Sequence, residues 1–275
     1  MTRRLALCAD GFGRSPAQSE AIAGLARRGR VNGISCLTNG PHWRAGAELL
    51  RDLPASIERG LHLNLTEGRP LSRDLLRVWS RFPALPNLIV RAHLRALPLA
   101  ALRAEFDAQF DAFVEANGEV PRFVDGCQHV HHLPGVRNVV LDALSRSPTQ
   151  IAVRNTGLVL GPGFERHRLM IEWTGGRTLS QRLRERGVAH NAALTGVYDR
   201  RAADYRVLMR HWLAAVPDQG ALLACEPDAD PVPVAGGPVA ARARERAYLE
   251  SAEFDADLRT FDIVLAPVWR VGAWW

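Results

Sequence analysis

The chain has 275 residues, of which 47% are hydrophobic and 23% charged, which is enough for a large buried core in one domain. The formal net charge is +6 and every basic residue is an arginine, but the arginines alternate with acids, so we expect no nucleic-acid partner. The four cysteines are too widely spaced for a disulfide framework, and no apolar run reaches membrane-spanning length.

The first predicted element is a short buried strand, Arg4–Ala9, that begins almost at once. The chain therefore lacks the long apolar segment of a signal peptide, and we expect a soluble, cytoplasmic protein with no membrane partner. A glycine-rich turn, Asp10–Gly13, follows the strand. Ser15 then supplies an N-cap, followed by a proline and a capping-box glutamine, Gln18, and the helix is predicted to continue to about Arg28.

Strands and helices alternate through the rest of the chain. The later predicted elements, in chain order, are a strand at Ile34–Leu37, a short helix at Ala45–Leu50, a strand within Glu58–Leu65, a helix from Pro98 to Ala116, a helix over Val136–Leu144, a strand at Ile151–Arg154, a helix over Ala202–Val216, a strand at Ala221–Cys225, a helix over Ala240–Leu258 and a strand at Ile263–Leu265. Residues 66–97 show no clear period, which predicts an irregular excursion over the mouth of the fold. This order predicts an α/β fold with a mostly parallel sheet, in a single domain over residues 1–275.

The stretch from residue 125 to residue 135 is the most informative part of the sequence. It carries an aspartate, a cysteine and three histidines within eight positions: Asp125, Cys127, His129, His131 and His132. Four of these side chains can bind a metal of borderline softness, and the fifth can orient a ligand or accept a proton. The stretch follows an apolar run and ends in Pro-Gly, which is typical of a strand that opens into a loop. The alternative is a polar surface loop with histidines by chance.

Other predicted strands also end in polar residues. These residues are Asp10, His62, Arg154 and Glu226. Functional groups gather at the carboxyl ends of the strands in parallel α/β folds, so these side chains are expected to converge on the 125–132 cluster. Such a set suits metal-assisted hydrolysis, in which a carboxylate takes a proton from water and a second group protonates a leaving amine. Taken singly, Asp10 could cap a turn and Arg154 could be a structural ion-pair partner.

These motifs together resemble the YdjC-like family of carbohydrate deacetylases, also called the ChbG/HpnK family. The similarity covers most of the chain, and the motifs that carry it are Ala9–Gly13, Val31–Gly40, Gly60–Thr66 with Gly68-Arg69-Pro70, Asp125–Pro134 and the segment around Ala240–Ala252. The resemblance implies a distorted β/α barrel of the glycoside hydrolase/deacetylase type. It also implies removal of an acetyl group from an N-acetylated sugar, the carbohydrate partner, with a bound divalent metal, Zn or Mg. Family members are often dimeric, so a homodimer is possible.

The resemblance also implies roles for individual residues. The general base would be Asp10, with Arg154 near the site and Glu226 at the position of the candidate general acid. The metal ligands that the resemblance implies are at His62 and Cys127, and a rearranged site would add a third ligand, His131 or Glu226. We expect substrate contacts from Asn64, Asp125 and His129.

This chain departs from the family pattern at three of these positions. Gly11 stands where the family has a metal-binding aspartate, and Cys127 replaces a histidine ligand. Glu226 replaces the histidine of a His-Pro-Gly motif. A thiolate ligand would favour zinc over magnesium, and either His131 or Glu226 would have to supply a further ligand.

Several hypotheses follow from these departures. The first is a metal-dependent deacetylase with a rearranged site. The second is a catalytically silent homologue that binds a glycan or regulates a partner. A further option is a thiol nucleophile at Cys127, with His129 or His131 as its base.

Overall fold

The computed structural model describes residues 2–202, 204–229 and 238–272. Its strands are β1 (Arg3–Phe12), β2 (Gly33–Cys36), β3 (Glu58–Leu63), β4 (Phe123–Gly126), β5 (Ala152–Val153), β6 (Leu194–Thr195), β7 (Ala221–Cys225) and β8 (Ile263–Leu265). The α-helices are α1 (Pro16–Arg27), α2 (Trp43–Arg51), α3 (Arg73–Val78), α4 (Leu85–His93), α5 (Leu99–Asn117), α6 (Val136–Leu144), α7 (Glu165–Ile171), α8 (Arg177–Glu185), α9 (Tyr205–Ala214), α10 (Pro238–Glu250) and α11 (Ala252–Thr260). A 3-10 segment, Cys127–His132, follows β4, and a π-helical turn, Glu172–Gly176, separates α7 from α8.

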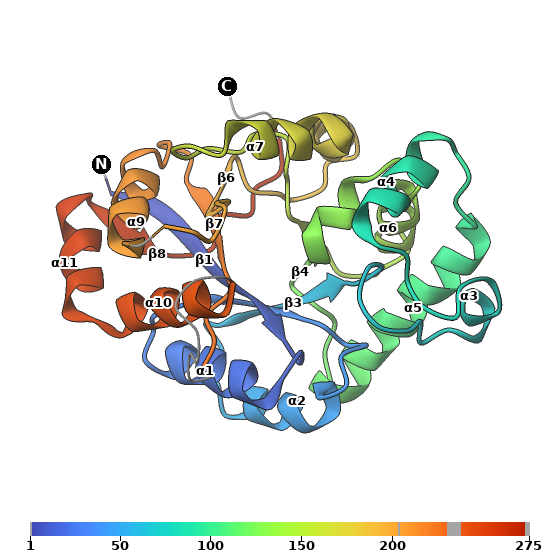
Figure 1. Ribbon diagram of the computed structural model, residues 1–275, viewed down its shortest axis with the longest axis horizontal. Coiled ribbons are helices and arrows are strands. Elements are labelled where there is room, and N and C mark those ends of the chain that lie inside the picture. Colours follow the sequence, from blue (N-terminus) through green and yellow to red (C-terminus); the bar gives the residue numbers. More distant parts are fainter. Residues whose placement is uncertain (1, 203, 230–237, 273–275) are drawn as a thin grey trace.

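The strands form one parallel sheet that curls into an incomplete barrel with helices around its outside (Figure 1). The strand order is β5-β4-β3-β2-β1-β7-β6, and β8 pairs with the beginning of β1. Between β5 and β6 the connection is reduced to isolated bridges, such as Val153 with His190 and Val159 with Leu194. The predicted α/β fold with a distorted barrel is therefore confirmed.

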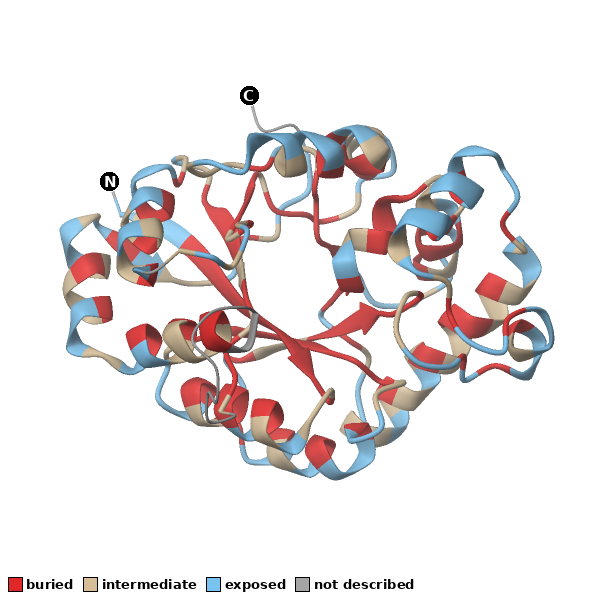
Figure 2. Ribbon diagram, in the orientation of Figure 1, coloured by how far each residue is buried: buried red, intermediate tan, exposed pale blue. Residues whose placement is uncertain are grey.

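The two faces of β1 explain why its sequence is continuously apolar. Leu5 and Leu7 face the helices in the main core, whereas Ala6 and Cys8 face the inside of the barrel. Buried faces on both sides are typical of parallel strands covered by helices, and Figure 2 shows these strands buried along most of their length. Small side chains inside the barrel leave room for large residues from other strands, such as Phe123.

The start of the chain differs in two details from the prediction. Strand β1 does not end at Ala9 but continues through Asp10 to Phe12, because Gly11 adopts a φ of 93° and allows an irregularity within the strand. Ser15 caps α1 as predicted, since its Oγ accepts the backbone N–H of Gln18. The Gln18 side chain does not complete a capping box, and its Nε2 donates to the carbonyl oxygen of Asp10 instead.

The expectation of an irregular excursion over residues 66–97 is wrong, because this segment contains α3 and α4. Ser72 caps α3 by accepting the N–H of Leu75, and Leu75 and Leu88 anchor the two helices in the core. In α3 only Leu75 is buried, and in α4 only Leu88 and Ala92 are buried, so neither helix gives a clear apolar period in the sequence. The segment does reach the mouth of the barrel, where α4 contributes Leu85 to a cavity wall.

The C-terminal half contains further differences. The single helix predicted over Ala240–Leu258 is two helices, α10 and α11, separated at Ser251. The elements α7, α8 and β6 were not predicted. Among the described residues, no helix combines the length and apolar character needed to cross a membrane.

Candidate active site

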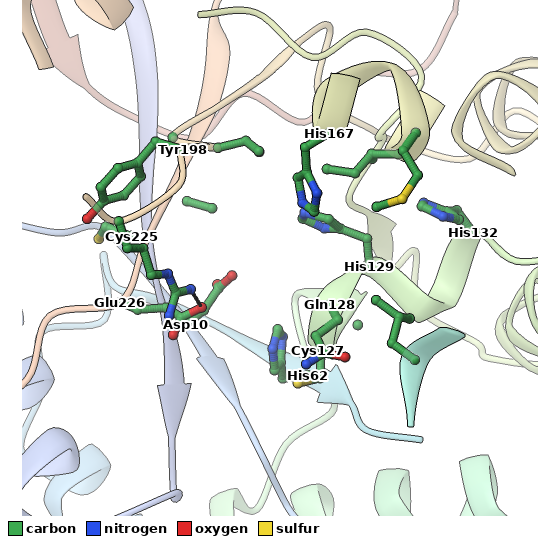
Figure 3. A pocket seen from close by; sticks show the side chains of 18 of the residues that line it. Asp10, His62, Cys127, Gln128, His129, His132, His167, Tyr198, Cys225 and Glu226 are labelled. Carbon is green, nitrogen blue, oxygen red and sulfur yellow. Dashed lines mark hydrogen bonds and ion pairs between the residues drawn. The ribbon is translucent and has the colours of Figure 1, made fainter. Parts of the chain in front are cut away.

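A cavity of about 380 Å³ opens at the carboxyl ends of the strands (Figure 3). Five of the predicted site residues line it: Asp10, His62, Cys127, His129 and Glu226. The other four predicted site residues, Asn64, Asp125, His131 and Arg154, lie behind this wall and do not line it. The predicted residues therefore gather in one region, in two layers around the cavity.

A buried ion-pair network lies beneath the cavity floor. Arg154 directly follows β5 and is 0% exposed. Its Nη1 and Nη2 donate to the two carboxylate oxygens of Asp10 at 2.7 and 2.6 Å, and Nη2 also pairs with the carboxylate of Asp125. Two buried carboxylates are thus held by one guanidinium, which fixes the orientation of Asp10 toward the cavity.

His62 connects this network to the cavity. Its Nδ1 lies 2.6 Å from Oδ1 of Asp125, the residue opposite it on the neighbouring strand, and 3.0 Å from Oγ of Ser35. The Ser35 hydroxyl in turn donates to Asp125 at 2.5 Å. Burial alone would lower the pKa of His62, but the charge of Asp125 and its hydrogen bond with the imidazole raise this pKa well above its ordinary value. Arg154 and His62 lower the pKa of Asp125 against the effect of burial.

The 3-10 segment after β4 turns sharply to place its side chains. Gln128 and His129 both have positive φ, at 51° and 62°, which is costly for residues other than glycine. Gly126 begins the turn, and a Cβ there would come within 2.9 Å of the backbone nitrogen of His131. The predicted loop is therefore a tight, sterically determined turn, and it directs Cys127 toward the cavity.

The three histidines of this segment are neutral imidazoles. Burial lowers the pKa of His129 and His132 well below the ordinary value, and lowers that of His131 to about 4. His131 donates through Nε2 to the carbonyl oxygen of Arg154 at 2.8 Å, so it supports the loop after β5. His132 bonds to Thr156 and Thr174, and His129 remains at the cavity wall.

Glu226 lies on the opposite side of the cavity from Cys127 (Figure 3) and is surrounded by arginines. It pairs with Arg14, Arg200 and Arg242. These cations lower its pKa to about 2 against the effect of burial, so it is ionised and unsuited to donate a proton at neutral pH. Its backbone N–H donates to Glu245, whose own pKa burial raises to about 7.

Sequence reasoning missed several residues at the cavity. They are Arg14, Glu67, His167, Tyr198, Arg200, Arg242 and Glu245. The arginines carried no signal, because arginine is spread along the whole chain. Ser35 was read only as part of a buried strand. Asn64 has a structural position: its Oδ1 accepts the backbone N–H groups of Thr66 and Glu67.

The expected metal ligands do not come together. Among the described residues, the one group of three His, Cys, Asp or Glu donor atoms within 4.8 Å of one another is Cys8, Asp10 and Asp125. The guanidinium of Arg154 already contacts all three of these side chains, so a cation occupies that position. His62 and Cys127 remain as neighbours, and Gly11 has no donor atom. The donor set thus does not fit the three protein ligands of a typical catalytic zinc site.

The protein is an α/β barrel of parallel strands, and polar side chains converge at the carboxyl ends of these strands. In this class of protein, the chemistry takes place at the carboxyl ends of the strands. Within this class, a family model for YdjC-like proteins matches residues 4–260, and the chain belongs to the YdjC-like family.

Named relatives agree with this assignment, and one solved structure shares the fold. A mouse protein named carbohydrate deacetylase is 40% identical over 149 residues, which cover 51% of this chain and 47% of the mouse protein. An Enterobacter protein named chitooligosaccharide deacetylase is 32% identical over 154 residues, covering 56% and 60% of the two chains. The chain spans about half the length of the curated vertebrate relatives that it matches. A solved structure from Enterococcus faecalis, proposed to be a cellobiose-phosphate cleavage protein, shares the fold with a TM-score of 0.72 at 20% identity, over 98% of each chain.

Proposed function

We propose that this chain is a carbohydrate deacetylase that hydrolyses the N-acetyl group of an amino sugar or oligosaccharide in the cavity. The observation that carries the proposal is the position of Asp10 at the cavity floor, in a chain whose relatives are named carbohydrate deacetylases. The cavity volume of about 380 Å³ falls in the range of small-molecule sites. The cavity is lined by polar side chains together with apolar ones such as Leu133 and Met170.

Asp10 is the proposed general base. Its two oxygens each accept a hydrogen bond from Arg154, which holds the carboxylate in one orientation and leaves lone pairs free for a water molecule. The water would lose its proton to Asp10 as it attacks the acetyl carbon. Arg154 acts behind Asp10, as a positioning residue. The ionised state of Glu226 removes it as the acid, so its proposed role is to hold Arg14 and Arg200 at the cavity wall.

The family implies a divalent metal. The two neighbouring side chains that could serve as ligands for it in this chain are those of His62 and Cys127. These two side chains fall short of a three-ligand site, so the roles given above assign no step to a metal. Elemental analysis of protein purified without chelators measures this directly. We expect well under one equivalent of zinc or magnesium per chain.

A second candidate function is binding of an N-acetylated glycan without hydrolysis. The replacement of a ligand by Gly11, which has no side chain, favours it. Both candidates use the same cavity, and turnover separates them.

The test is acetate release from N-acetylated chito-oligosaccharides, together with calorimetric binding of the same sugars. Hydrolysis predicts turnover that falls by at least about 100-fold in Asp10→Asn. Asp74→Asn is the matched control, because Asp74 is exposed on α3 and pairs only with Arg77 among the described contacts. Binding without acetate release would replace the deacetylase with the second candidate. Absence of both would remove the two proposals.

A further inference from the structure

The cavity of the proposed deacetylase has little room beyond one sugar unit. Its volume of about 380 Å³ lies near the lower end of the range for small-molecule sites, about 300–1,000 Å³. On one side its wall is formed in part by helix α7, through His167 and Met170. A longer sugar chain seated in the cavity therefore has to extend over its rim.

A second, more open hollow of about 570 Å³ adjoins the cavity along α7. Its lining residues are Gly163, Phe164, Glu165, Arg166, His167 and Met170. Two of them, His167 and Met170, also line the cavity, so the two spaces meet at these side chains. Figure 3 shows the His167 ring extending from α7 toward the cavity. A ligand in the cavity thus has this hollow as its next contact surface on that side.

Phe164 presents an aromatic face at this junction. The residue is 39% exposed, and its ring stacks on that of His167 with 4.6 Å between the ring centroids and 27° between the planes. Its backbone φ is 53°, in the left-handed region that is costly for a bulky residue. Such outliers cluster at active sites and ligand-binding sites. The chain thus keeps a partly exposed ring at the rim of the cavity in spite of a cost in backbone energy.

The hollow combines the two kinds of contact that a sugar ring makes. A pyranose ring has an apolar face of C–H groups and an edge of hydroxyl groups. Phe164 and Met170 offer apolar surface, whereas Glu165 can accept hydrogen bonds and Arg166 can donate them. Among the described residues, neither of these two charged side chains has an ion-pair partner, so both can bind hydroxyl groups. A purely apolar ligand would instead cover two charges and leave them unpaired.

We propose that this hollow is a second sugar subsite with Phe164 as its stacking platform, and that the substrate is an oligosaccharide of at least two sugar units. In this arrangement the acetylated unit occupies the cavity. Its neighbour lies against Phe164, with its hydroxyl groups toward Glu165 and Arg166. The proposal rests on the proposed function for the kind of sugar, and it goes further by assigning the length of the substrate and the surface that selects it.

Trp173 provides a matched control on the same segment. It lies in the π-helical turn after α7 and is 69% exposed, but it lines neither the cavity nor the hollow. The guanidinium of Arg177 lies over its ring, 4.7 Å from the centroid. Removal of the Trp173 ring should therefore leave sugar binding unchanged, although it deletes a large exposed aromatic surface close to the subsite.

The experiment compares N-acetylglucosamine with its β-linked dimer, di-N-acetylchitobiose. Saturation-transfer NMR measures the Kd of each sugar and detects released acetate in the same sample. We expect the dimer to bind the unchanged protein at least about 10-fold more tightly than the monomer. In Phe164→Ala this preference should fall to about 2-fold or less, because the second sugar unit loses its stacking surface, whereas N-acetylglucosamine should bind as before.

Three further variants complete the comparison. Trp173→Ala should keep the full preference for the dimer, and so should Phe164→Trp, because it retains an aromatic ring at the platform. Phe164→Leu keeps most of the side-chain volume while it removes the aromatic face, so it should lose the preference as Phe164→Ala does. Circular dichroism checks that each variant folds.

The outcomes separate this proposal from the proposed function. Equal affinity for the two sugars, or no binding of either, would overturn the subsite. A preference for the dimer that survives in Phe164→Ala and Phe164→Leu, or that Trp173→Ala abolishes equally, would overturn it as well. Acetate release without a preference for the dimer would keep the deacetylase and reject the subsite. A preference that depends on Phe164 without acetate release would keep the subsite and replace the deacetylase with the glycan-binding candidate.

Discussion

At the scale of single residues, the centre of the site is a set of buried charges. Arg154 lies between Asp10 and Asp125, and His62 binds the second of these carboxylates. The strand-end pattern in the sequence was sufficient to select these four residues, because parallel strands end at one edge. The same pattern could not reveal that the Arg154 guanidinium lies between the carboxylates, where a metal ion could otherwise bind, because this depends on the orientation of the side chains.

Removal of Arg154 should destabilise the protein strongly. Arg154→Met leaves two buried carboxylates without their shared cation, and we expect the free energy of unfolding to fall by about 3–5 kcal/mol. Urea unfolding followed by circular dichroism measures this. The control is Arg77→Met, in an exposed pair with Asp74, which should change stability by less than about 0.5 kcal/mol. Similar losses in both variants would contradict the network's role.

Glu245 should make stability depend on pH. Its pKa is raised from 4.5 to about 7 in the folded protein, so the folded state holds a proton that the unfolded state releases. The stability from this group is complete below about pH 4.5 and is lost as the pH rises through 7, by roughly 3 kcal/mol. Glu245→Gln should flatten this part of the profile, since an amide resembles the protonated carboxyl.

Urea midpoints measured from pH 5 to pH 8 give the comparison for Glu245. Glu115→Gln, on the exposed surface of α5, is the control and should keep the pH dependence of the unchanged protein. An identical slope in Glu245→Gln and the unchanged protein would count against the assignment.

At the scale of elements, periodicity decided what the sequence could predict. The long helix α5, the helix α6 and the strand β7 were predicted nearly to the residue, because each has a clear apolar pattern. The elements α3 and α4 were missed because each buries only one or two of its residues, which leaves no clear apolar pattern in the sequence. The turn after β4 depends on close packing around Gly126, which a sequence pattern does not show.

Gly126 should be intolerant of a side chain. In Gly126→Ala the new Cβ would come within 2.9 Å of the His131 nitrogen, so the 3-10 segment must shift, at a cost of about 1–3 kcal/mol. Gly24→Ala is the control within helix α1, where the nearest contact for a Cβ is 3.8 Å, and it should stabilise the protein by up to about 1 kcal/mol. Thermal unfolding of the two variants should therefore shift in opposite directions.

At the scale of the whole molecule, the family's barrel is retained while its expected metal ligands are not assembled. The fold match spans nearly the entire chain at 20% identity, and the site residues come from β1, β3, β4, β5 and β7 or the turns that follow them. Gly11 and Cys127 stand at positions where the resemblance to the family implies other metal-binding side chains. This makes the expected ligand set testable by substitution alone.

The double variant Gly11→Asp with Cys127→His should bind about one zinc ion per chain, measured by elemental analysis after dialysis. The positive φ of Gly11 strains an aspartate there, although the nearest atoms, at 2.9–3.1 Å, belong to the flexible Gln18 side chain and can move. Cys127→His alone is the control and should bind zinc more weakly, since Gly11 still lacks a donor. One equivalent of zinc in the unchanged protein would contradict this account.

The central place of β1 in the sheet has a consequence for how the chain is made. Its register sets Leu5 beside Ala221 and Arg3 beside Ile263, so the first strand finds two of its partners only after nearly the whole chain has emerged from the ribosome. Until then β1 can pair with β2 alone, and one edge of an apolar strand stays open to other chains. Folding of this protein is therefore expected to be slow and late, and premature termination before β7 should yield aggregates rather than a smaller folded barrel.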